Sequence, residues 1–303
     1  SFSKWQPIYG LEDQVAAKMI HGTVDILIDL SGHTEHNRLP VFAYKPAPVQ
    51  VSWLGYWAST GVAEMDYLLG DPVVTPHGVE SNFTEMLWRF PNTRFCYTPP
   101  LADIPLRESP FLDNRHITFG SFNKLSKLTD EVVKVWSEIL NRVSGARLFL
   151  KSKQLEDPEI RLSTQARFTR HGVGSDRLIF EGVTSREDYL DAFNRIDIAL
   201  DPFPFPGGTT SADAIWMGVP VLTKKGDTLI SRQGEGILTS AKLSEWIALD
   251  NQSYVSKAIE FATNVEWLAQ LKKELREREG TRPLYYADRF ARDFEGVLQA
   301  IWK

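Results

Sequence analysis

Short apolar runs alternate with amphipathic stretches between residues 116 and 223. Each apolar run has the length of a buried strand, whereas the hydrophobic residues between the runs recur at helical spacing. Strands and helices that alternate in this way predict a doubly wound parallel sheet, whose ligands bind outside the carboxyl ends of the strands. The predicted strands are residues 116–122, 147–151, 177–180, 196–200 and 219–223, and the helices between the first four are residues 130–140, 158–168 and 185–193.

A smaller set of apolar runs precedes this region. Its predicted strands are residues 24–30, 49–56, 65–69 and 86–90, and its predicted helices are residues 13–19 and 38–44. Residues 97–110 contain four prolines and are the most linker-like part of the chain. After the second region, residues 254–278 and 289–302 have amphipathic helical patterns whose apolar stripes indicate core packing. The pattern therefore predicts an α/β chain of two units.

The stretch from Ile196 to Thr223 carries the clearest chemical signal. A buried strand ends at three prolines, Gly207 and Gly208 follow, and a helix begins that Thr209 or Thr210 is expected to cap. A helix N-terminus that follows glycines at the carboxyl end of a strand can bind an anion, typically a phosphate. An ordinary tight turn between strand and helix is the alternative.

A second cationic feature follows the strand at residues 116–122. Lys124 and Lys127 lie in the loop after this strand, and in a parallel sheet that loop meets the Gly207 loop at one edge. The two features together favour a phosphate-binding site over a simple turn. Asp213, one turn into the helix, is suited to accept hydrogen bonds from ribose hydroxyls, although it could equally complement the helix dipole.

Composition narrows the class of protein. The 303 residues carry a net charge of −5, which argues against a general nucleic-acid-binding or membrane-surface protein and leaves a local basic pocket open. Cys96 is the single cysteine, which excludes a disulfide framework and a cysteine-ligated metal site and favours a reducing compartment. No apolar run reaches the roughly 20 residues of a membrane-spanning helix. Because the chain begins at Ser1 without a methionine, we expect a fragment of a longer protein.

The sequence has neither a metal-ligand spacing nor a DxD pair after a strand, so we expect no metal ion. If the bound anion is the diphosphate of a nucleotide sugar, we expect Lys127 and helix N–H groups to neutralise its charge. His33, in the polar loop after the first predicted strand, is a candidate contact for a ligand, with a solvated or structural role as the alternative.

Several long motifs in a fixed order resemble a known family. SGHT, PAPVQVSWLGY, ITFGSFNKLSKLT and ALDPFPFPGGTTSADAIWMGVPVLT look like the catalytic region of O-linked N-acetylglucosamine transferases and their bacterial relatives, glycosyltransferase family 41. The resemblance implies a GT-B-like fold with two facing Rossmann-like doubly wound sheets, the first incomplete. It implies a partial N-terminal, acceptor-side lobe with linker at residues 1–110, a nucleotide-sugar-binding lobe at 111–282, and a C-terminal helix at 283–303 that returns to the first lobe.

The resemblance also assigns roles to residues. Lys127 matches the family lysine at the donor diphosphate, Thr209 and Thr210 match the threonines at the phosphate-binding helix, and Asp213 matches the ribose-binding acid. Gly208 stands where some relatives have histidine, and Trp57 replaces the proline usual after WLGY. The predicted catalytic residues are Lys127 and His33. The predicted donor-binding residues are Lys124, Lys127, Thr184, Arg186, Tyr189, Gly207, Gly208, Thr209, Thr210 and Asp213.

The implied activity is inverting transfer of N-acetylglucosamine from UDP-GlcNAc to Ser or Thr hydroxyls of proteins, without metal or cofactor, in the cytoplasm. The alternatives are a SPINDLY-like O-fucosyltransferase that uses GDP-fucose and a catalytically silent nucleotide-sugar-binding or scaffold fragment. The implied partners are a nucleotide sugar, a protein or peptide acceptor, and an N-terminal segment with tetratricopeptide repeats that is absent from this chain; neither nucleic acid nor membrane is expected.

Overall fold

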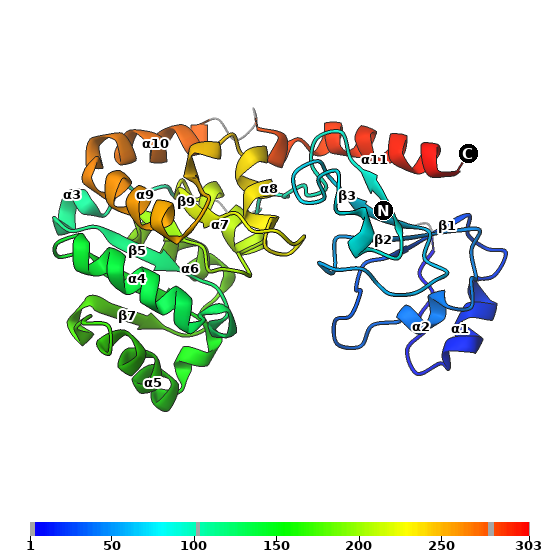
Figure 1. The fold of residues 1–303 in the computed structure, drawn as a ribbon, viewed down its shortest axis with the longest axis horizontal. Helices are drawn as coiled ribbons and strands as arrows, with labels where there is room; N and C mark the ends of the chain where they lie inside the picture. Colours follow the sequence, from blue (N-terminus) through cyan, green and yellow to red (C-terminus); the bar gives the residue numbers. More distant parts are fainter. Residues whose placement is uncertain (1–3, 101–103, 278–281, 303) are drawn as a thin grey trace. The chain divides into compact units, whose positions relative to one another are not determined.

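The computed structural model describes residues 4–100, 104–277 and 282–302 (Figure 1). The chain divides into two compact units. The first consists of Ser1–Phe95 together with Asp288–Lys303, and the second consists of Cys96–Ala287. Each unit is built on its own parallel sheet with helices around it, so the predicted α/β class is confirmed.

The second unit contains a six-stranded sheet in the order β10-β9-β8-β5-β6-β7, in which neighbouring strands are parallel. The strand order reverses between β5 and β8, as the doubly wound prediction requires. In such sheets the crevice at the reversal is the usual place for a ligand. The strands are β5 (Thr118–Ser121), β6 (Arg147–Lys151), β7 (Leu178–Glu181), β8 (Ile198–Leu200), β9 (Val221–Lys224) and β10 (Ile247–Ala248).

Helices pack beside this sheet. Within the second unit α4 contacts α5 and α9, and α7 contacts α8 and α10 (Figure 1). Strand β5 is buried along its whole length, and a Cβ at Gly120 would come within 2.6 Å of the Ile196 side chain. The larger helices are α4 (Asp130–Arg142), α5 (Pro158–Thr169), α6 (Arg186–Asp191), α7 (Thr209–Trp216), α8 (Gln233–Ser240), α9 (Asn251–Thr263) and α10 (Val265–Glu277).

The first unit has a four-stranded parallel sheet in the order β1-β2-β3-β4. The apolar stripe of the last helix, α11 (Ala287–Trp302), packs on this sheet, because Val297 and Ile301 share a buried cluster with Val51, Leu69 and Phe90. The remaining elements are β1 (Ile26–Asp29), β2 (Val49–Trp53), β3 (Tyr67–Gly70), β4 (Met86–Arg89), α1 (Asp13–Ile20), α2 (Leu39–Phe42) and the four-residue helix α3 (Phe111–Asn114), which belongs to the second unit.

Two boundaries differ from those expected. The sequence assigns residues 97–110 to the first lobe, whereas the described part of this stretch, residues 97–100 and 104–110, belongs to the second unit. Side-chain hydrogen bonds hold them there: Tyr97 donates to Asp213, and Ser109 donates to Asp197. The helix expected at residues 254–278 is two helices, α9 and α10, because the backbone leaves helical geometry at Asn264; residue 278 lies outside the described residues.

Candidate functional site

Lys127 joins the two loops that the sequence predicts at one sheet edge. It ends the 3-10 turn Leu125–Lys127 after β5, and its Nζ donates to the main-chain oxygen of Pro206 at 2.8 Å and to Asn123 Oδ1 at 3.2 Å. The ammonium lies 3.9 Å from the centre of the Phe205 ring, a cation–π contact. Burial lowers the pKa of Lys127 below its usual value of 10.5, and the charge of Asp201 opposes this shift. The predicted meeting of the two loops is therefore confirmed.

The Gly207 loop leads into α7 without a threonine cap. The N-cap is Gly208, whose conformation is not helical, and Thr209 is the first helical residue, so the expected threonine cap is wrong. The intrahelical hydrogen bonds begin at the Gly208 carbonyl, which accepts from Ser211 N and Ala212 N. A Cβ at Gly207 would come within 2.2 Å of Ser211 Oγ, so only glycine fits this turn.

Asp213 lies in a network of side chains instead of facing solvent. Its carboxylate is 1% exposed and takes a bidentate contact from Arg186, with Nη1–Oδ2 at 2.9 Å and Nη2–Oδ1 at 2.6 Å. The Tyr97 hydroxyl also donates to Oδ1. Burial and this hydrogen bond raise the pKa of Tyr97, and the bond to Asp213 raises the pKa of Arg186. A carboxylate has lone pairs to spare for a further donor, so ribose binding by Asp213 stays a prediction.

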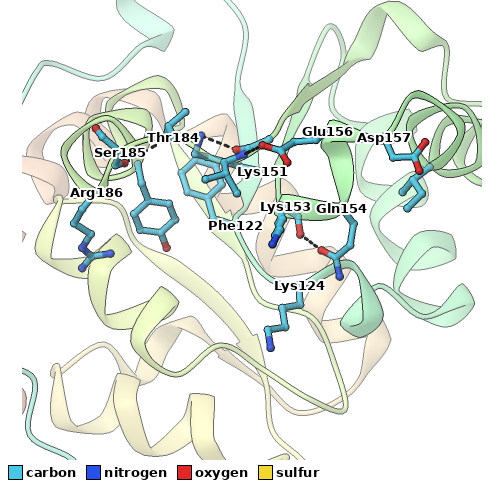
Figure 2. A pocket seen from close by; sticks show the side chains of 15 residues that line it. Phe122, Lys124, Lys151, Lys153, Gln154, Glu156, Asp157, Thr184, Ser185 and Arg186 are labelled. Carbon is cyan, nitrogen blue, oxygen red and sulfur yellow. Dashed lines mark hydrogen bonds between the residues drawn. The ribbon is translucent and has the colours of Figure 1, made fainter.

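A cavity of about 850 Å³ lies at the carboxyl ends of β6 and β7. Four predicted donor-binding residues line it, namely Lys124, Thr184, Arg186 and Tyr189. Figure 2 shows Thr184, Ser185 and Arg186 along one side and Glu156 and Asp157 on the other. The other predicted donor residues are not among its lining residues; these are Lys127, Gly207, Gly208, Thr209, Thr210 and Asp213.

Aromatic rings pack against one another beside the cavity. Tyr189 packs against Phe122 with ring centres 5.8 Å apart and against Phe193 at 5.5 Å, and Arg186 lies over the Tyr189 ring at 5.1 Å. Burial raises the pKa of the Tyr189 phenol, so this group is neutral at physiological pH. A flat apolar wall beside Lys124 and Arg186 suits a planar base attached to a phosphate chain.

Sequence reasoning missed one wall of this cavity. Lys151 is 3% exposed, and its Nζ donates to Glu181 Oε1 at 2.5 Å and to the Gly182 oxygen at 3.1 Å. Beyond it, Lys153, Gln154 and Glu156 lie on a 3-10 turn that also lines the cavity. The rule that ligands meet the carboxyl ends of parallel strands could have found these residues, because they directly follow β6.

His33 belongs to the first unit, in the loop after β1. Its exposed ring meets the Tyr56 ring edge to face, with centres 5.2 Å apart. Two glycines allow the contact between their loops: a Cβ at Gly32 would come within 2.2 Å of Tyr56 Cβ, and a Cβ at Gly55 within 1.7 Å of the Leu30 oxygen. The SGHT and WLGY motifs are therefore the two halves of one packed loop pair.

The described residues show neither a metal-type cluster nor a membrane-type helix. They contain no group of three or more His, Cys, Asp or Glu side chains placed to hold a metal ion. In the same part of the chain, no helix has the length and apolar character to cross a bilayer.

The strand order of the six-stranded sheet and the glycine loop after β8 define a Rossmann-like unit of the kind found in GT-B-like folds. The family model for glycosyl transferase family 41 matches residues 9–98 and 102–294, and the chain belongs to that family.

The relatives agree with this assignment. The chain is 35% identical over 301 residues to a tomato (Solanum lycopersicum) protein described as a probable UDP-N-acetylglucosamine–peptide N-acetylglucosaminyltransferase SPINDLY, a match that covers 99% of this chain and 32% of the relative. A Caenorhabditis elegans UDP-N-acetylglucosamine–peptide N-acetylglucosaminyltransferase is 22% identical over 96% of this chain and 35% of its own length. The structure of a Thermobaculum terrenum O-GlcNAc transferase mutant is 32% identical with a TM-score of 0.94, over 99% of this chain and 57% of that one. The chain thus spans about a third of the length of the curated relatives it matches.

Proposed function

We propose that this chain is the part of a protein O-glycosyltransferase that binds a nucleotide sugar and transfers N-acetylglucosamine from UDP-GlcNAc to Ser or Thr hydroxyls. The observation that carries the proposal is the contact of Lys127 with the Gly207 loop, which brings a partly buried ammonium to the loop that leads into α7. A cation and helix N–H groups together suit a diphosphate. The names of the relatives support N-acetylglucosamine as the sugar.

In the proposed reaction, the acceptor oxygen forms a bond to the anomeric carbon while the bond from that carbon to the diphosphate oxygen breaks. This single displacement inverts the anomeric configuration and releases UDP. Lys127 and the first N–H groups of α7 stabilise the negative charge that grows on the leaving diphosphate. Thr209 and Thr210 contribute N–H groups there, and Asp213 with Arg186 and Tyr189 holds the nucleoside. The acceptor proton passes to a general base, for which His33 is the candidate on the first unit.

A GDP sugar is the second candidate donor. The motif FNKLSK with TT and MGVP further along is shared with SPINDLY-like O-fucosyltransferases, and this observation favours GDP-fucose. The size of the cavity, about 850 Å³, admits either base. A silent nucleotide-sugar-binding fragment is the third candidate, because the chain spans about a third of its curated relatives. We further propose that the acceptor is a protein, that a tetratricopeptide segment belongs to the whole protein, and that it acts in the cytoplasm.

Calorimetric titration of the 303-residue chain with UDP, GDP, UDP-GlcNAc and GDP-fucose tests the donor site. We expect UDP and UDP-GlcNAc to bind and Lys127→Ala to abolish most of the affinity. Lys134→Ala is the matched control, since Lys134 is exposed on α4 and should bind like the wild type. Absence of binding by every nucleotide, or equal binding by Lys127→Ala, would exclude the proposed site, and a preference for the guanine nucleotides would select the second candidate.

A transfer assay separates an enzyme from a binding fragment. The chain is incubated with each nucleotide sugar and a mixture of Ser/Thr peptides, and intact mass is recorded. A mass gain of one N-acetylhexosamine supports the leading proposal, and a gain of one deoxyhexose supports the alternative. Nucleotide binding without any mass gain identifies the silent fragment.

A further inference from the structure

Asp201 is a buried carboxylate directly beneath the Gly207 loop, and none of the roles above involves it. It follows β8 and is 1% exposed. One oxygen, Oδ1, accepts from Gly207 N at 2.7 Å and from Ser211 Oγ at 3.0 Å. A single oxygen therefore holds both the turn and the first helical turn of α7. A buried carboxylate is costly unless its environment uses it, so its presence needs an explanation.

Side chains from two further elements also donate hydrogen bonds to the Gly207 loop. Lys127 Nζ binds the Pro206 carbonyl at 2.8 Å, and Gln233 Nε2, at the start of α8, binds the Gly207 carbonyl at 3.1 Å. These carbonyl oxygens are thereby engaged by protein donors. Within α7, the first bonds run from Ser211 N and Ala212 N to the Gly208 oxygen, so the N–H groups of Thr209 and Thr210 precede the intrahelical ladder.

The polar groups of this loop therefore fall into two sets, those bound by other protein groups and those available to a ligand. The Gly207 N–H is bound inward by Asp201, two carbonyls are bound by Lys127 and Gln233, and the N–H groups at the start of α7 are left for an anion. Donors that are fixed before the ligand arrives cost no reorganisation when charge develops on it.

We propose that Asp201 is a positioning residue for the donor diphosphate: by accepting from Gly207 N–H and Ser211 Oγ, it fixes the loop so that the first N–H groups of α7 converge on the phosphates. This inference rests on the proposed function. Lys127 is the charged group that faces Asp201 from the neighbouring loop, and burial raises the pKa of Asp201 to about 6 in spite of it. Asp201 acts through the loop and does not itself touch the donor.

The shape of the site predicts different effects for an asparagine and an alanine at position 201. A Cβ at Gly207 would meet Asp201 Oδ1 at 2.9 Å, and a Cβ at Gly234 would meet Asp201 Oδ2 at 3.0 Å and Thr223 Oγ1 at 2.1 Å. The carboxylate thus fills a space bounded by two glycines. Asparagine has the same shape and keeps one acceptor oxygen, whereas alanine removes the acceptor and leaves two donors unpaired.

The test compares Asp201→Ala and Asp201→Asn with the wild-type chain, using UDP and uridine, and GDP and guanosine in parallel. Uridine and guanosine lack phosphate, so their affinity reports the nucleoside pocket alone. We expect Asp201→Ala to weaken nucleoside diphosphate binding about tenfold or more and to leave nucleoside binding within about twofold, as for the loss of one to two aligned hydrogen bonds. Asp201→Asn should restore diphosphate affinity to within about threefold of the wild type.

Three outcomes would overturn the inference: unchanged diphosphate affinity in folded Asp201→Ala, equal losses for nucleoside and nucleoside diphosphate, or an Asp201→Asn chain as weak as Asp201→Ala. If the wild-type chain binds no nucleotide, the proposed function fails instead. Asp250→Ala is the control for general destabilisation, because Asp250 caps α9 through Ser253 N at 2.7 Å. If Asp201→Ala does not fold, Ser211→Ala and Gln233→Ala each remove one hydrogen bond that holds the loop. Unchanged diphosphate affinity in both variants would then overturn the inference.

Discussion

The ammonium of Lys127 donates a hydrogen bond to the main-chain oxygen of Pro206, a residue 79 positions further along the chain, at 2.8 Å. The two residues follow β5 and β8, the neighbouring strands between which the strand order reverses. The bond therefore links the two loops that lie at the crevice where such a sheet usually binds a ligand. It also fixes the position of the cation before any anion binds.

The partly buried position of Lys127 predicts that nucleotide affinity begins to fall at a lower alkaline pH than it would with an ordinary lysine. Burial lowers the pKa of Lys127 below 10.5, so the ammonium loses its proton, and with it the attraction to the diphosphate, at a lower pH. We expect UDP affinity, measured by calorimetry from pH 7 to 10, to decline over this range in the wild type. Lys127→Met should bind about 10- to 100-fold more weakly at pH 7, as for a lost charge-assisted hydrogen bond.

The comparison with Lys127→Met tests whether Lys127 causes the alkaline decline in UDP affinity. Without an ionisable group at position 127, the residual affinity should lose its alkaline decline. A decline of the same size in Lys127→Met would show that another group is responsible. Lys134→Met, at an exposed position on α4, should keep both the affinity and the pH profile of the wild type.

Much of this site could be predicted from local pattern. The run from Ile196 to Thr223 contains a buried strand, a glycine turn, a helix and another strand, and each has a signal that depends on residues close in sequence. The meeting of the Lys127 and Gly207 loops followed from the parallel topology alone. The start of α4 carries a local signal of the same kind, because Thr129 precedes two acidic residues, and its side chain accepts from Val132 N at 3.3 Å.

The pairing of side chains could not be predicted, because it depends on groups distant in sequence. Tyr97 lies in a proline-rich stretch that reads as a linker, yet it is 5% exposed and donates to Asp213, 116 residues away. Arg186 and Asp213 each carry a plausible separate role, and nothing local indicates that they bind each other. The threonine cap failed for a related reason, since the Gly208 carbonyl and Asp201 organise the start of α7 instead.

Removal of Arg186 should destabilise the second unit, because Asp213 is 1% exposed and would lose its bidentate partner. We expect Arg186→Ala to lower the free energy of unfolding by about 2 kcal/mol. Arg186→Lys should lower it by somewhat less, because lysine keeps the positive charge although it cannot make the paired contact. Urea unfolding measures the change. Arg142→Ala is the control, because its pair with Glu138 is exposed and should contribute less than about 0.5 kcal/mol. Equal small losses in both variants would show that the Arg186 pair does not support the fold.

The buried ammonium of Lys272 leads us to expect that the free energy of unfolding rises at alkaline pH. Its side chain is 4% exposed, its Nζ has no hydrogen-bond partner among the described residues, and burial lowers its pKa to about 8, against the opposing charge of Asp197. Between pH 8 and 10.5 the unfolded chain binds this proton more tightly than the folded chain, so unfolding becomes less favourable as pH rises. The contribution is about 3 kcal/mol over that interval.

Urea unfolding of the wild type and Lys272→Met at several pH values from 7 to 10 tests this. The variant removes a buried charge and keeps the volume, so it should be at least as stable at pH 7 and should show a smaller rise above pH 8. Lys273→Met, at the exposed neighbouring position, should retain the wild-type rise. An identical pH profile in Lys272→Met would contradict the assignment.

A change from glycine to alanine should have opposite effects on the free energy of unfolding at positions 55 and 296 of the first unit. A Cβ at Gly55 would lie 1.7 Å from the Leu30 oxygen and 2.2 Å from its carbonyl carbon, and main-chain atoms of a packed loop cannot move aside cheaply. Gly55→Ala should therefore lower the free energy of unfolding by about 3 kcal/mol or more, as for severe overpacking, and should separate the loop of Tyr56 from that of His33. Gly296 lies in α11 with nothing within 4 Å of its added Cβ, so Gly296→Ala should raise stability by about 0.5–1 kcal/mol through helix propensity. Urea unfolding followed by circular dichroism measures both changes, and a Gly55→Ala chain that unfolds at the wild-type urea concentration would mean that the two loops are not packed as described.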